Sequence, residues 1–253
     1  MRIKFGFSLL LICLFTNCAM AQSPYYYQLK IYHLKGEKQL ETTENYLRDA
    51  YLPALHKQGF KHIGVFKPIE IDTAEQLIYV FIPYKNLNKL AELEKTLAND
   101  KTFLSSGKAY LDSDYKQAPF TRIENILMEA FRGMPMPAVP KLSSPKAERV
   151  YELRSYEAAT EKLSVNKIDM FNDAEMEIFT KLDFNAIFYG QVIAGSRMPN
   201  LMYLTTFNNK ADRDKHWGAF GAEYKKISGL PQYQNNVSKI NTSFLYPTDY
   251  SDY

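Results

Sequence analysis

The stretch Tyr27-Gln28-Leu29-Lys30-Ile31-Tyr32 returns later in the chain as Tyr151-Glu152-Leu153-Arg154-Ser155-Tyr156, at an offset of 124 residues (151 minus 27). Other apolar, aromatic-rich segments recur at the same offset: residues 60–63 with 184–187, and residues 77–80 with 201–204. Such segments are typical of β-strands. Their common register indicates two copies of one unit, and so long a period predicts a domain with its own core rather than a solenoid repeat.

Within each copy the hydrophobic period switches in the same order. The first copy predicts strands at 25–33, 60–68, 76–83 and 120–128, a helix at 38–58 and a second helix through Leu90, Leu93 and Leu97. The second copy predicts strands at 149–157, 184–193, 200–207 and near 236–245, and helices at 163–182 and 209–227. The order βαββαβ predicts a ferredoxin-like α+β unit, with both helices on one face of an antiparallel sheet. We expect the two uncovered sheet faces to pack on each other as an intramolecular pseudo-dimer, a dimeric α+β barrel within one chain.

Local signals set the helix ends and the domain limits. Pro53 predicts a kink or a restart in the first helix, and Gly59 predicts its C-terminal cap. Residues 132–147 contain Gly133 and four prolines, which predicts an extended linker. The expected domains are therefore residues 22–131 and residues 148–253.

The N-terminus predicts export. Arg2 and Lys4 precede a short apolar run, and Ala19-Met20-Ala21 offers a signal-peptidase site, so residues 1–21 are expected to be a signal peptide. The protein is then periplasmic or secreted. Cys18 leaves lipid anchoring open as the alternative, but Phe15 and Asn17 are a poor match to a lipoprotein signal. No later run is long and apolar enough to predict an integral membrane span.

Removal of residues 1–21 changes the charge and the cysteine content. Of the 31 Lys and Arg residues 29 then remain, against 28 Asp and Glu, so no electrostatic footprint for nucleic acid is left. Both cysteines, Cys13 and Cys18, also leave with this segment. The mature chain has no disulfide and no thiol nucleophile, and its cores must stabilise it.

Particular motifs resemble those of the NIPSNAP family. Residues 150–156 resemble the E-L-R-x-Y opening of NIPSNAP domains, residues 52–60 resemble a family helix that carries proline and ends at glycine, and residues 212–220 resemble the family's second helix, where Arg and an aromatic pair recur. The resemblance covers about residues 25–130 and 148–246. In the first half, Lys30 and His33 stand where the second has Arg154 and Glu157.

The resemblance implies architecture more than activity. NIPSNAP domains belong with the dimeric α+β barrels, a superfamily that includes small monooxygenases, haem-degrading and chlorite-degrading enzymes, isomerases and proteins without known activity. Fold alone does not supply the reaction. The sequence itself has no H-x-x-H, H-E-x-x-H, G-x-S-x-G, phosphate-loop or dinucleotide motif, so we predict no metal site.

Polar side chains on apolar strands are the candidate binding residues: Lys30, Tyr32, His62, Tyr79, Arg154, Tyr156 and Tyr203. If one sheet face meets the helices and the other meets the second sheet, part of this set points into an enclosed space. Tyr79 and Tyr203 are taken as equivalent, 124 residues apart. A cation, a phenol and an imidazole there could bind a carboxylate or enolate and move a proton. We favour a structural interpretation, in which tyrosine rings pack and Arg154 pairs with Glu152 or Glu157.

His216 and the aromatic C-terminus carry further hypotheses. His216 lies beside Trp217 at the edge of a helical apolar stripe, which suits a surface-edge histidine and leaves an axial haem ligand as the alternative. We predict no cofactor on this basis. The tail with Tyr246, Tyr250 and Tyr253 is expected to be partly disordered.

Three functions remain open from the sequence, of which we favour the first. The protein binds a small apolar or aromatic molecule in the pseudo-dimer cavity. Alternatively it is a cofactor-independent or haem-using oxidoreductase or isomerase, or a structural or partner-binding protein without a ligand. Its oligomeric state, a homodimer included, is left open.

Overall fold

The computed structural model describes residues 23–253 of the chain. The predicted signal peptide, with Cys13 and Cys18, lies outside the described residues. None of the described helices is long and apolar enough to cross a membrane.

The elements follow the expected order in both halves. The first half contains β1 (Tyr26–Leu34), α1 (Gly36–Tyr46), the π-helical turn η1 (Leu47–Tyr51), α2 (Leu52–Lys57), β2 (Gly64–Pro68), β3 (Gln76–Tyr84), α3 (Leu87–Leu97), α4 (Lys101–Ser106), α5 (Lys108–Leu111), η2 (Tyr115–Gln117) and β4 (Arg122–Ala130). The second half contains η3 (Lys146–Glu148), β5 (Val150–Glu157), α6 (Glu161–Met170), the π-helical turn η4 (Phe171–Glu175), α7 (Met176–Lys181), β6 (Phe188–Ala194), β7 (Asn200–Phe207), α8 (Lys210–Ser228), η5 (Pro231–Tyr233) and β8 (Lys239–Pro247).

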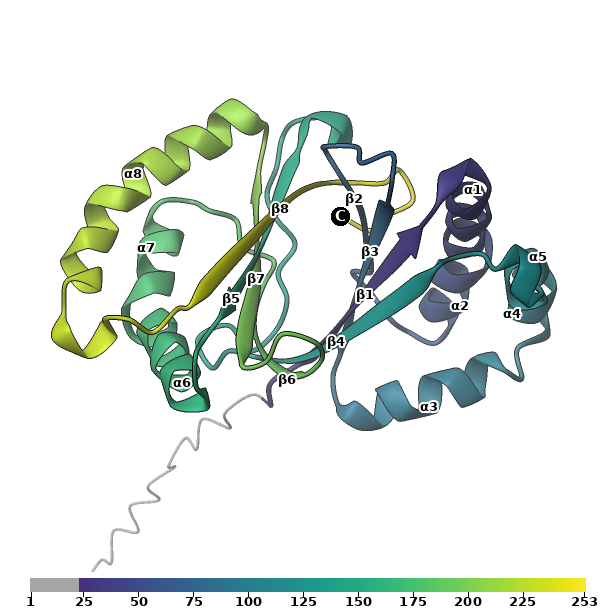
Figure 1. Ribbon diagram of the computed structural model, residues 1–253, viewed down its shortest axis with the longest axis horizontal. Coiled ribbons are helices and arrows are strands. Elements are labelled where there is room, and N and C mark those ends of the chain that lie inside the picture. Colours follow the sequence, from purple (N-terminus) through teal and green to yellow (C-terminus); the bar gives the residue numbers. More distant parts are fainter. Residues whose placement is uncertain (1–22) are drawn as a thin grey trace, which may run out of the picture.

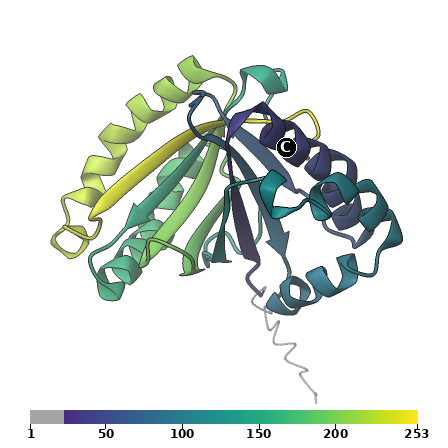
Figure 2. The same cartoon turned by 45° about the vertical axis from the view of Figure 1, so that its right-hand side comes forward.

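The strands close into a barrel in the order β1-β3-β2-β8-β5-β7-β6-β4. Each half contributes the ferredoxin-like order of fourth, first, third and second strand. The halves join through antiparallel β2–β8 and β4–β6 pairs. Helices cover the outer face of each sheet, α1 to α5 on one side and α6 to α8 on the other (Figures 1 and 2). The predicted tandem α+β barrel is therefore confirmed.

Both faces of each sheet are buried. An inner core fills the barrel between the sheets, and Phe81 from the first half stacks there on Phe188 from the second, with ring centroids 4.8 Å apart. An outer core lies between sheet and helices in each half. Close packing of this kind leaves little room inside the barrel.

The helical layers of the two halves share an irregularity, a π-helical turn at equivalent positions. The π-helical turns at Leu47–Tyr51 and Phe171–Glu175 are 124 residues apart. Pro53 is accommodated just after the first turn, but its counterpart in the second half is Glu177, so proline is not the cause of the turn. Gly59 has a left-handed φ of 83° after α2, which confirms it as the cap.

The second strand is shorter than the sequence predicted. β2 begins at Gly64 rather than residue 60, because His62 has a left-handed φ of 59° that interrupts extended backbone. Its five residues contrast with the nine of β3. This difference leaves part of β3 without a neighbour on that side.

The linker and the C-terminus close one end of the barrel. Ala138 N–H donates to Ile187 O and Ser143 N–H to Asn208 Oδ1, so the linker follows the second half. The tail does not match the expected disorder: Tyr253 is 3% exposed and its ring packs on Phe66 in the inner core. The domain limits remain a prediction.

Phe81→Ala is expected to destabilise both halves together. The ring is fully buried between the two sheets, so its loss leaves a cavity in the shared core and costs about 3–5 kcal/mol. Trp217, the one tryptophan in the sequence, lies in the second half and reports on that half during urea unfolding. We expect its fluorescence transition to move to lower urea along with the far-UV circular dichroism transition.

A Trp217 transition that stays in place in Phe81→Ala would show that the halves unfold independently. Ile71→Ala is the control, because a side chain that is 77% exposed should change stability by less than about 0.5 kcal/mol.

Candidate functional site

A gap in the barrel wall lies between β3 and β8. β2 pairs with β3 over Gly64–Phe66 and with β8 over Phe66–Pro68, and Ile69 N–H adds one bond to Phe244 O. The chain then leaves the sheet through the 69–75 loop. The first residues of β3 and of β8 therefore face each other without a strand between them, and we call this opening the window.

A groove of about 510 Å³ occupies the window. Apolar and aromatic side chains form about half of its lining: Leu40, Pro68, Ile71, Leu77, Tyr79, Phe244 and Tyr246. Thr242 and Ser243 of β8 and several carboxylates complete it. This volume lies within the range of about 300–1,000 Å³ that small-molecule sites occupy.

A smaller chamber of about 100 Å³ lies behind the window, in the mouth of the barrel. Leu77, Tyr79 and Ser243 line both spaces, so the groove and the chamber adjoin. Polar side chains converge on the chamber: His33, Glu124, Ser155, Ser196, Arg197, Asn200 and Asn241. At about 30 Å³ per water molecule it holds a few waters or a small head group.

His33 is a nearly enclosed titratable group of the chamber, at 6% exposure. Its Nδ1 lies 2.9 Å from Glu75 Oε1, and its Nε2 lies 3.2 Å from Glu124 Oε1, without hydrogen-bond geometry at Nε2. Whichever ring nitrogen carries the proton, a carboxylate faces it. Such a group can exchange a proton with a molecule whose polar end enters the chamber.

The neighbours of His33 have shifted pKa values. Burial acts to raise the pKa of Glu124, but Arg122 and His33 outweigh it and the pKa is lowered. Burial raises the pKa of the Tyr79 phenol, against a hydrogen bond with Ser243. At neutral pH the chamber therefore offers a carboxylate and a neutral phenol.

Tyr79 is the predicted site residue that reaches this site. Its supposed equivalent, Tyr203, does not, because the third strands correspond at an offset of 123 rather than 124: Tyr79 pairs with Ile31, whereas Tyr203 pairs with Arg154. A shift of one residue turns a side chain to the other face of a strand. Met202, not Tyr203, shares the inner core with Tyr79.

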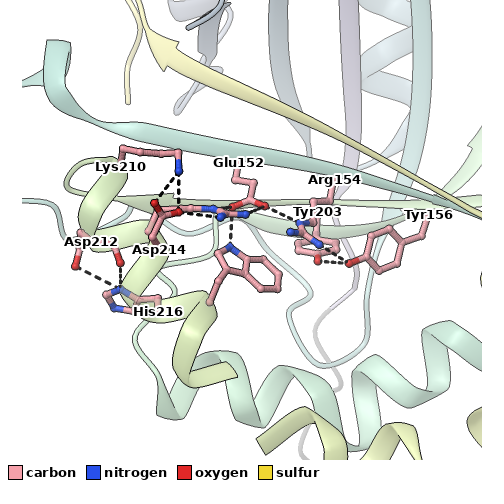
Figure 3. A network of polar contacts seen from close by, with 10 residues as sticks. Glu152, Arg154, Tyr156, Tyr203, Lys210, Asp212, Asp214 and His216 are labelled. Atoms are coloured by element: carbon pink, nitrogen blue, oxygen red, sulfur yellow. Dashed lines mark hydrogen bonds and ion pairs between the residues drawn. The ribbon is translucent and has the colours of Figure 1, made fainter. Parts of the chain in front are cut away.

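Arg154, Tyr156 and Tyr203 do come together, but in the helical layer of the second half (Figure 3). Arg154 Nη1 donates to the Tyr156 hydroxyl at 3.1 Å, and the hydroxyls of Tyr156 and Tyr203 are 2.8 Å apart. The expectation that these polar residues point into the space between the sheets is wrong. Neither the groove nor the chamber is lined by them.

Glu152 organises this network. It is fully buried on β5 and accepts hydrogen bonds from Arg154 Nε, Arg213 Nε and Trp217 Nε1, each at 2.7 Å (Figure 3). The Arg154 guanidinium also lies 3.8 Å from the centroid of the Trp217 ring. Residues of the family motifs thus connect α8 to β5 through hydrogen bonds and ion pairs. The expected Arg154–Glu152 pair is present.

Lys30 and Tyr32 lie in the helical layer of the first half, also away from the inner core. Lys30 Nζ lies 5.1 Å from the centroid of the Tyr51 ring, and burial lowers its pKa against the attraction of Glu94. His62 is not on the second strand as expected, but precedes it, exposed. The structure therefore divides the predicted set among separate places.

His216 lies on α8 beside the aromatic outer core and lines neither the groove nor the chamber. Its Nδ1 lies 2.7 Å from Asp212 O, and its ring packs 5.7 Å from Phe184 and 5.5 Å from Phe207, measured between centroids. The aromatic outer core fills the space beside it. Among the described residues no group of three or more His, Cys, Asp or Glu side chains is placed to hold a metal ion.

Apart from Tyr79, sequence reasoning missed the polar residues that line the chamber, above all His33 and Glu124. A signal for His33 was present, because it continues the alternation of Leu29 and Ile31, which face the inner core. Glu124 lies on β4 and Glu75 in the loop before β3, far from His33 in the sequence, and the pairing of β4 and β3 with β1 brings them to His33.

The fold and the packing between halves define the class of this protein as a dimeric α+β barrel built within one chain. Similar structures include a candidate monooxygenase from Lactobacillus acidophilus NCFM (14% identity, TM-score 0.53, covering 89% of this chain and 94% of that one). Another candidate monooxygenase, from Fusobacterium nucleatum subsp. nucleatum, has 8% identity and a TM-score of 0.58, covering 89% and 93%. An anthrone oxidase-like protein has 9% identity and a TM-score of 0.51, covering 90% and 93%. At these identities the likeness shows the fold alone.

Residues 151–252, the second half of the chain, match the family model of NIPSNAP. The match covers β5 to β8 and includes Glu152, Arg154, Arg213 and Trp217 of the network. No curated protein matches the sequence.

Glu152→Gln is expected to lower the free energy of unfolding by about 3–5 kcal/mol, because two partly buried guanidinium groups lose the fully buried carboxylate that pairs with them. Burial acts to raise the pKa of Glu152, but Arg213 and Arg154 outweigh it and the pKa is lowered. A carboxylate of this kind stabilises the fold above its unfolded pKa of about 4.3 and loses that effect as the pH falls through the folded pKa.

The wild-type protein should therefore lose stability more steeply than Glu152→Gln below about pH 4.3, measured by urea unfolding across a pH series. Glu177→Gln, at an exposed position of α7, is the control. Equal stability of wild type and Glu152→Gln at pH 7 would contradict the role given to the network.

Proposed function

We propose that the protein binds a small, predominantly apolar molecule in the groove at the window between β3 and β8. The observation that carries this proposal is an apolar groove of about 510 Å³ that adjoins a polar chamber. Sites for small molecules combine these features, with apolar walls for affinity and a few polar groups for orientation. The binding site differs in place from the sequence expectation, because the space between the sheets is packed and the opening lies at its edge.

The geometry supports binding in the window more than in the second-half helical layer. In that layer the polar atoms of Glu152, Arg154 and Tyr156 already bond to one another, so a ligand would have to break existing contacts. In the groove, by contrast, the lining side chain of Ile71 is 77% exposed, close to Leu77 and Phe244 of the same lining. Covering them with an apolar molecule removes this surface from water.

Thr242→Trp is expected to weaken binding at least about tenfold, since an indole at this exposed strand position occupies the groove. Nile red, an uncharged dye whose emission reports an apolar site, serves as the probe in a fluorescence titration. Lys215→Trp on α8 adds the same ring at an exposed position elsewhere and should leave the affinity unchanged. Absence of dye binding to the wild type, or equal binding to Thr242→Trp, would count against the groove.

We also propose that the protein is exported after cleavage following Ala21. The n-region, the apolar run and Ala19-Met20-Ala21 support this proposal. Intact-mass measurement of the protein from the source cells should give a chain that begins at Gln22. A mass that begins at Cys18 and carries acyl chains would replace it with lipid anchoring, and a mass that retains Met1 or Arg2 would contradict export.

A further inference from the structure

The rim of the groove is acidic. Among the described residues that line it are the carboxylates of Glu37, Glu70, Asp72 and Glu75, against one ammonium, that of Lys67. Glu70, Asp72 and Glu75 all belong to the loop that replaces β2 at the window. The charge of the groove is thus set by the segment whose departure from the sheet opens it.

The ammonium of Lys67 does not neutralise this rim. Its Nζ lies 3.1 Å from Glu44 Oε1, outside the groove lining, so its charge is already paired. Glu70 has no cationic partner among the described residues, and Asp72 accepts only a hydrogen bond from Ala74 N–H within its own loop. Glu75 faces His33.

We propose that the occupant of the groove is a cationic amphiphile, with an apolar body against Leu77 and Phe244 and an ammonium or similar head at the acidic rim. This inference rests on the proposed binding function and names its ligand class. Charge complementarity carries it, since a cation gains attraction from the carboxylates of Glu70 and Asp72, which have no cationic partner among the described residues, whereas an anion of the same shape meets repulsion from both. The apolar lining supplies the rest of the affinity.

The chamber behind the window adds a second observation that points to a ligand, because a buried polar atom faces it. His33 is 94% buried, at 6% exposure, and its Nε2 has no hydrogen-bond partner although it lines the chamber. A buried polar atom without a hydrogen-bond partner is unfavourable, and a polar group of a ligand could supply one. The apolar groove therefore has acidic groups at its rim and hydrogen-bonding groups at its inner end.

The test uses probes that share one alkyl chain and differ in head-group charge: decyltrimethylammonium, decanol and decanoate. Each competes with Nile red for the full protein at pH 7 and low salt. We expect the cation to displace the dye at a concentration at least about tenfold below that of decanoate, with decanol between them. Raising the salt concentration from about 20 to about 500 mM should reduce the difference in affinity between the cation and decanoate, because the rim is exposed to solvent and its charges are screened.

A charge-removing variant isolates the rim. Glu70→Gln with Asp72→Asn keeps the shape of the loop, because the asparagine Oδ1 still accepts from Ala74 N–H. It should weaken decyltrimethylammonium about threefold to tenfold and leave decanol unchanged. Glu177→Gln with Asp183→Asn removes two exposed charges elsewhere and is the matched control.

The outcomes separate the two claims. Displacement by decanol or decanoate at least as strong as by the cation overturns the cationic ligand and leaves the groove as a binding site. Failure of Nile red and of all three probes to bind overturns the binding function as well. Equal loss of cation affinity in the rim variant and in the control variant overturns the role of the 69–75 loop.

Discussion

The two halves of the chain are held together by the packing of their sheets, at the centre of which the ring of Phe81 stacks on that of Phe188. The rest of the structure depends on this contact. The rings come from β3 and β6, lie 4.8 Å apart between centroids and are nearly parallel, at 8°. Around them the inward side chains of both sheets form one core, which each sheet needs because neither half can cover its inner face alone. The repeat seen in the sequence therefore has a physical reason, because each sheet needs the other to cover its inner face.

The same constraint decides where a ligand can bind. A filled inner core excludes the middle of the barrel, and Tyr253 closes one end. The opening is left where β2 stops at Pro68, four residues short of the length of β3, and where the chain leaves as an acidic loop. Apolar lining, acidic rim and polar chamber therefore have one cause, the early end of one strand. The network around Glu152 serves the opposite purpose, because it holds α8 on the sheet and leaves its polar atoms satisfied.

The sequence predicts the fold well and the site poorly, for a definite reason. The strand order, the pairing of the halves and the cap at Gly59 follow from the 124-residue repeat and from local signals. Alternation along a strand separates its two faces, but it does not say which face meets helices and which meets the other sheet when both are buried. Arg154 and Tyr156 were therefore assigned to the wrong layer, and Tyr203 was misplaced by a one-residue change of register. His33 with Glu75 and Glu124 was missed because the cluster depends on the exact register of β1 with β4 and on the course of the 69–75 loop, which local sequence signals do not give.

The central claim is that ligands enter at the window and not in the helical layer, and methyl NMR tests it most directly. Protein labelled at Ile and Leu methyl groups is titrated with decyltrimethylammonium. The account predicts shifts at Ile71 and Leu77, which line the groove, with Ile168 and Ile178 of the second-half outer core unchanged. Saturable shifts at Ile168 and Ile178 with Leu77 unmoved would contradict it and would place the site beside Arg154, between the sheet and the helices.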